Sequence, residues 1–158
     1  MWKAENGLRR VKRLNRLFAY SQSAIVRWTL TFTWSTITAS LMLSPSGNGT
    51  MVSTISKLFG GTETTDAIGH VIISIILAFL WCWAISLYVS VPEATRLVLS
   101  GGIIWGFVAE LSQYFVPERG TSLLDLGANT LGVLIGLTVY RWLAAQYSPL
   151  DDQDTWRG

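Results

Sequence analysis

The sequence predicts an all-α protein that lies in a membrane as an integral four-helix bundle. Of its 158 residues, 50% are hydrophobic and only 14% are charged, whereas about a quarter of a typical soluble domain is charged. Several apolar runs approach the ~20 residues that an α-helix needs to cross a bilayer. Basic residues also crowd ahead of the first apolar run, which is a signal of membrane topology. The length suits one domain.

The basic N-terminal segment, residues 1–27, is the first feature of the chain. Its Lys and Arg residues are Lys3, Arg9, Arg10, Lys12, Arg13, Arg16 and Arg27. Residues 7–20 repeat apolar side chains at helical spacing, which predicts an amphipathic helix on the anionic cytoplasmic leaflet. A flexible, positively charged tail is the alternative. Because an apolar run follows, we interpret the cluster as an orientation signal and expect no nucleic-acid partner.

Residues 28–146 form the predicted membrane domain. Its four expected spans are Trp28–Leu43, Ala67–Val89, Thr95–Val116 and Leu123–Tyr140. The first is rich in Thr, whose β-branching favours strands. An open strand cannot span a bilayer, however, whereas a helix can accept hydrogen bonds from its own Thr hydroxyls. Pro92 is expected to end the second span and Pro117 the third.

Two further segments flank these spans. The loop between the first two spans is expected to hold a short interfacial helix at Val52–Phe59. The C-terminal tail, residues 147–158, is acidic and is expected to fray.

The basic N-terminus predicts the orientation of the bundle. It is held in the cytoplasm, and four spans then return the C-terminus to the same side. The start of the second span, the end of the third and the start of the fourth meet at the extracytoplasmic face. His70, Glu110 and Asn129 each lie roughly 6–9 Å in from that face, at 1.5 Å of rise per residue.

Polar residues at this depth indicate a site, because lipid does not tolerate them without reason. The same helix faces carry small residues that allow close helix packing. These are Gly102, Gly106, Gly132 and Gly136. We therefore expect the polar side chains to point inward and to converge between the last three spans. The predicted site comprises Asp66, His70, Glu110, Gln113, Arg119, Asp125 and Asn129.

At these residues the chain resembles the VanZ-like family of small bacterial membrane proteins. The resemblance runs from Asp66 to about Gly136 and rests on four ordered motifs. They are Asp66-x-x-x-His70, Gly106-x-x-x-Glu110-x-x-Gln113, Pro117-x-Arg119 and Asp125-x-x-x-Asn129-x-x-Gly132. Glu118 stands where Gly is commoner, and Gly69 where the family often has a bulkier residue. The resemblance implies a membrane protein of four or more helices, in a family whose founding member is linked to teicoplanin resistance.

Three interpretations of the polar residues are open. They form an interhelical clamp, a binding site, or the active site of an enzyme that acts on a lipid-linked or cell-wall precursor. In the last, His70 is a general acid or base and Arg119 binds a phosphate or carboxylate. Oxygen ligands from Glu110, Asp125 and Asn129 would suit a hard cation, while one His and one Cys argue against zinc. We favour a binding or accessory role, with catalytic residues unknown and no metal or cofactor expected.

The tryptophans suggest another class of function, a structural or assembly subunit of a respiratory or photosynthetic type of membrane complex. The chain has eight Trp residues. Trp34, Trp81, Trp83 and Trp105 are expected deep in the spans, where they pack on partner helices, on a pigment or lipid, or within the bundle itself. Packing within the bundle is the favoured alternative. Membrane lipids and protein partners are the expected contacts.

Overall fold

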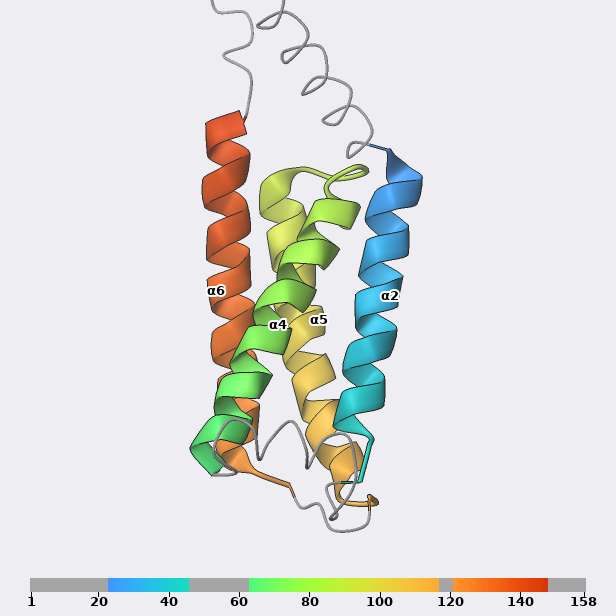
Figure 1. The fold of residues 1–158 in the computed structure, drawn as a ribbon. Helices are drawn as coiled ribbons and strands as arrows, with labels where there is room; N and C mark the ends of the chain where they lie inside the picture. Colours follow the sequence, from blue (N-terminus) through green and yellow to red (C-terminus); the bar gives the residue numbers. More distant parts are fainter. Residues whose placement is uncertain (1–22, 46–62, 117–120, 148–158) are drawn as a thin grey trace, which may run out of the picture.

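A computed structural model describes residues 23–45, 63–116 and 121–147. Within them the chain forms four α-helices, and no strand is found there. They are α2 (Ala24–Met42), α4 (Glu63–Ile85), α5 (Val91–Gln113) and α6 (Leu123–Tyr147), which run side by side (Figure 1). The prediction of an all-α protein is confirmed.

Three of these helices are long and apolar enough to cross a membrane. The qualifying stretches are Thr64–Ile85, Val91–Gln113 and Leu123–Gln146. The predicted first span corresponds to α2, which is not among them, so a fourth span stays a prediction. The predicted helices at residues 7–20 and 52–59, together with most of the C-terminal tail, lie outside the described residues.

The junction between α4 and α5 differs from the prediction. α4 begins at Glu63 and ends at Ile85, about one turn earlier at each end than expected, and Pro92 lies in the first turn of α5 after the N-cap residue Ser90. Proline is tolerated there because the amide it lacks would have no partner inside the helix. Pro92 therefore starts a helix, whereas we had expected it to end one.

Polar contacts attach α2 to α4. The Thr31 hydroxyl, which is fully buried, donates to its own helix at Arg27 O (2.8 Å) and lies 3.1 Å from Leu80 O of α4. The guanidinium of Arg27 donates to Trp83 O (2.7 Å) near the end of α4 and lies 5.0 Å from the centre of the Trp83 ring. A cation at this position also interacts favourably with the dipole of α4.

Most of the deep tryptophans pack within the described helices. Trp34 donates to Ile73 O (3.3 Å) and Trp81 to the hydroxyl of Ser35 (3.1 Å), so both join α2 to α4. Trp81 and Phe32 meet edge to face, with ring centres 6.0 Å apart. Trp105 is partly exposed.

The closest helix contact joins α4 to α6. A Cβ atom built on Gly132 would lie 2.5 Å from Val71 O, and one built on Gly136 would overlap Ile75 O. Only glycine permits backbones to approach this closely. Ala78, Cys82, Val133 and Leu137 continue the buried core toward the other end of the two helices.

Gly132→Ala is expected to destabilise the protein. Because the new methyl group overpacks the α4–α6 contact, the free energy of unfolding in detergent should fall by about 1–3 kcal/mol. The control is Gly127→Ala on the same helix, where an added Cβ meets nothing within 4 Å. Denaturant titration followed by circular dichroism measures both. Equal stability of the two variants would contradict the close contact.

Candidate functional site

One end of the helices gathers the predicted polar residues. α4 begins there, α5 ends there and α6 begins there, at the bottom of Figure 1. The start of α2 and the end of α6 lie at the opposite end. The site-forming side chains of Asp66 and His70 come from α4, those of Glu110 and Gln113 from α5, and those of Asp125 and Asn129 from α6.

His70 lies at the centre of this region and is held from one side. It is only 6% exposed, and its Nδ1 lies 3.2 Å from Oδ1 of Asn129. The same Asn129 oxygen accepts a hydrogen bond from the Ser74 hydroxyl (2.9 Å), one turn further along α4. Because an amide oxygen only accepts, this contact places a proton on Nδ1 of His70. The other ring nitrogen, Nε2, is left to face the carboxylates.

Those carboxylates belong to Asp66 and Asp125. Nε2 of His70 lies 3.9 Å from Oδ2 of Asp125, longer than a hydrogen bond. One ligand atom from each of Asp66, His70 and Asp125 lies within 4.8 Å of the others. We call Asp66, His70, Asp125 and Asn129 the histidine cluster. Two carboxylate oxygens and one imidazole nitrogen at this spacing form a donor set able to hold a cation.

Both acids lie at the N-terminal ends of helices. Asp66 and Asp125 each lie in the first turn of a helix, α4 and α6, where the macrodipole stabilises negative charge. The hydroxyl of Ser122 also accepts a hydrogen bond from the backbone N–H of Asp125 (3.3 Å), which caps α6. The cluster is thus built to keep carboxylates at a membrane depth where they are costly.

Glu110 and Gln113 form a second buried pair at the same end. They are 5% and 2% exposed. Oε2 of Glu110 accepts a hydrogen bond from the backbone N–H of Ser122 (3.0 Å), so this carboxylate ties the end of α5 to the start of α6. Arg119, also expected here, lies outside the described residues.

Two serines in this region were not predicted as site residues. Ser74 lies one helical turn beyond His70, so its position on the same face was visible in the sequence. Ser122 precedes the apolar start of α6, where Ser is a common N-cap. The acids near Asp125 also differ from expectation. The cation site we considered comprised Glu110, Asp125 and Asn129, whereas the structure places Asp66 and His70 near Asp125, because the glycines of α6 bring α4 close.

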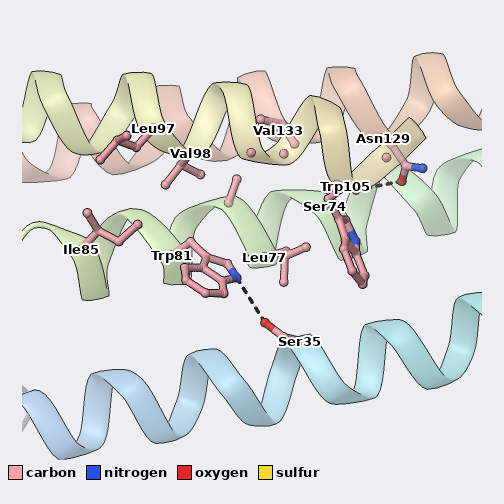
Figure 2. Close-up of a pocket in the computed structure, with 14 residues that line it drawn as sticks. Ser35, Ser74, Leu77, Trp81, Ile85, Leu97, Val98, Trp105, Asn129 and Val133 are labelled. Atoms are coloured by element: carbon pink, nitrogen blue, oxygen red, sulfur yellow. Dashed lines mark hydrogen bonds between the residues drawn. The ribbon is translucent and has the colours of Figure 1, made fainter. Parts of the chain in front are cut away.

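An apolar cavity of about 330 Å³ adjoins the cluster (Figure 2). α4 and α5 supply most of its walls, with Ser35 from α2. Asn129, which contacts His70, and Ser74, which donates to Asn129, also line the cavity. The apolar cavity therefore meets the polar histidine cluster at these two residues.

A family model described as VanZ/LLP1 matches residues 16–144, a stretch that contains the histidine cluster. The chain belongs to the VanZ/LLP1 family. The resemblance noted in the sequence is confirmed, and membership together with three membrane-capable helices makes this a membrane protein. No curated protein and no solved structure matches the chain.

The role of Glu110 in this VanZ/LLP1 protein can be tested by two substitutions. Glu110→Ala removes the acceptor of the Ser122 N–H and should lower the free energy of unfolding by about 1–3 kcal/mol. Glu110→Gln keeps an oxygen acceptor and should cost clearly less. Thermal denaturation in detergent compares the two. If both variants lose the same stability, the negative charge of Glu110, and not its hydrogen bond, is what stabilises the protein.

Proposed function

We propose that this VanZ/LLP1 protein spans the bacterial inner membrane four times, with both termini in the cytoplasm. On this proposal it binds a positively charged group at the histidine cluster, near the extracytoplasmic face. Its role is that of a binding or accessory protein.

The length and contacts of α2 support the fourth span. α2 has 19 residues, which at 1.5 Å of rise per residue give about 28 Å, close to the ~30 Å of a hydrocarbon core. It lies along α4 for much of its length (Figure 1). The hydroxyls of Thr31, Ser35 and Thr36 donate to backbone carbonyls of α2, which lowers the cost of placing them in lipid.

The arginines support the proposed orientation. Among the described residues, the chain has Arg27, Arg96 and Arg141. These lie near the start of α2, the start of α5 and the end of α6, all at the end away from the histidine cluster. Since Lys and Arg concentrate on the cytoplasmic side of membrane proteins, the cluster is assigned to the extracytoplasmic side.

The geometry of His70 is the observation that carries the binding role. Asn129, which also accepts a hydrogen bond from Ser74, contacts Nδ1 of the ring, and Nε2 then faces the two aspartates. A histidine oriented by an outer hydrogen bond toward carboxylates is the arrangement found at many cation sites. The chemistry selects positive charge, supplied either by a divalent metal ion or by the ammonium group of a lipid.

The orientation is tested by cysteine labelling. Thr121→Cys, in an exposed position, should react with a membrane-impermeant maleimide applied to intact spheroplasts, while Glu93→Cys should react only after permeabilisation. The natural chain supplies the control, because its one cysteine, Cys82, is fully buried. The reverse pattern of labelling would contradict the proposed side of the cluster.

The binding role is tested with two probes on the purified chain. Asp125→Asn is expected to weaken binding of Mn²⁺, or retention of phosphatidylethanolamine, by about tenfold or more, because such affinities follow the number of charged ligands. Electron paramagnetic resonance measures the first and native mass spectrometry the second, so the two sources of positive charge are told apart.

Glu93→Gln is the matched control. It makes the same change of a carboxylate to an amide in the first turn of a helix, at the opposite end of the protein. The proposal is wrong if Asp125→Asn alters neither Mn²⁺ binding nor lipid retention relative to Glu93→Gln.

A further inference from the structure

The cavity beside the histidine cluster is a groove between α2 and α5. Its walls include Leu97, Gly101 and Gly106 of α5 and Ser35 of α2, while α4 and α6 close it behind. Contacts between α2 and α5 are few, since α2 packs chiefly on α4. Figure 2 shows Trp81 held by its hydrogen bond to Ser35 on one side of this space. The groove is therefore open between two helices that do not close on each other.

Glycine makes the room inside the groove. Gly101, Gly102 and Gly106 all line it. A Cβ on Gly102 would lie 2.9 Å from the side chain of Val133, whereas a Cβ on Gly101 would meet nothing within 4 Å. No atom of the described residues thus fills the space in front of Gly101. At about 330 Å³, the cavity falls within the roughly 300–1,000 Å³ usual for small-molecule pockets.

The surroundings and the length of the groove indicate which kind of ligand it can hold. Leu97 (53% exposed) lines the groove, and Ile104 (63%) and Phe107 (57%) expose apolar side chains elsewhere on α5, as expected of a helix that meets lipid. From Leu97 to Gly106 the groove follows α5 for nine steps, or about 13 Å at 1.5 Å each. One leaflet of the hydrocarbon core measures about 15 Å, half of the ~30 Å total. The groove is therefore about as long as one leaflet is thick, which suits a single lipid chain.

The end of the groove near Asn129 is polar. Asn129 is 2% exposed, and its Nδ2 finds no hydrogen-bond partner among the described residues. Its Oδ1 binds Ser74 and His70, beyond which lie Asp66 and Asp125. An occupant with a hydrocarbon chain in the groove would thus bring its headgroup to two carboxylates. Charge complementarity favours a headgroup that carries an ammonium.

We infer that the groove holds an acyl chain of a phospholipid whose ammonium headgroup, of the phosphatidylethanolamine type, lies at the histidine cluster. This inference rests on the proposed cation-binding role of the cluster and names the class of ligand. The chain enters sideways from the outer leaflet between α2 and α5. Its headgroup donates to Asp66 and Asp125, and its ester or phosphate oxygens accept from the free N–H of Asn129.

A substitution that fills the groove tests lipid binding there without changing the residues of the histidine cluster. The full-length protein and its Gly101→Leu variant are placed in nanodiscs of phosphatidylethanolamine and phosphatidylglycerol. Native mass spectrometry then measures how many lipid molecules of each type each protein retains when it is released. Gly101→Leu should retain roughly tenfold less phosphatidylethanolamine, the factor produced by an overpacking cost of about 1.4 kcal/mol. It should still bind Mn²⁺ as the natural chain does, if the cluster takes that ion.

Gly127→Leu is the matched control, because Gly127 is a helical glycine with open space around it and does not line the groove. It should retain lipid like the natural chain. If Gly101→Leu fails to fold, as judged by size-exclusion chromatography, Leu97→Trp narrows the groove from the same helix and carries the same expectation.

Three results would overturn the inference. One is equal retention of phosphatidylethanolamine by the Gly101 and Gly127 variants. Another is equal retention of phosphatidylglycerol and phosphatidylethanolamine by the natural chain, which would show that the site does not select an ammonium headgroup. The third is that a protein, and not a lipid, copurifies with the natural chain and no longer copurifies with the Gly101→Leu variant. Loss of Mn²⁺ binding in Asp125→Asn but not in Gly101→Leu would leave the cation-binding role intact in each of these cases.

Discussion

The contact between α4 and α6 at Gly132 and Gly136 is the constraint on which the polar site depends. Any side chain at these positions would meet the backbone of α4, so the distance between the two helices is fixed by glycine. Since His70 lies one turn before Ser74, and Asn129 less than one turn before Gly132, the close contact continues directly into the histidine cluster. A wider spacing would remove the 3.2 Å contact between His70 and Asn129.

The same constraint explains why two acids tolerate each other near the membrane. α4 and α6 begin at the same end, so the positive ends of both helix dipoles point at Asp66 and Asp125. Ser122 caps α6, and Glu110 in turn holds Ser122. Negative charge is thus supported by backbone groups, which cannot move away. On the proposed binding role, a positive ligand would meet these charges without requiring a side chain to change its position.

The helices, the membrane and the polar residues could be predicted from the sequence because lipid constrains all three. Apolar runs of about 20 residues are typical of membrane helices, and acids within such runs are rare unless they have a role. The pairing of Asp66 with Asp125 could not be predicted, since it depends on which helices lie closest. The four glycines of the two GxxxG pairs could not be told apart in the sequence. In the structure, Gly132 and Gly136 face the backbone of α4, whereas Gly102 and Gly106 face side chains of α6. Pro92 was misplaced because proline both ends and begins helices.

The groove depends on the way in which α2 is attached. Phe32 of α2 meets Trp81 of α4 edge to face. α2 is also joined to α4 by hydrogen bonds from Thr31, Trp34 and Arg27 to backbone carbonyls. In lipid, where apolar packing between helices gains little over packing against acyl chains, such bonds set the position of a helix. These bonds hold one side of α2 against α4, while the side of α2 that faces α5 makes few contacts with it. A helix attached in this directional way keeps a groove open beside it, which a helix packed by apolar contacts alone would close.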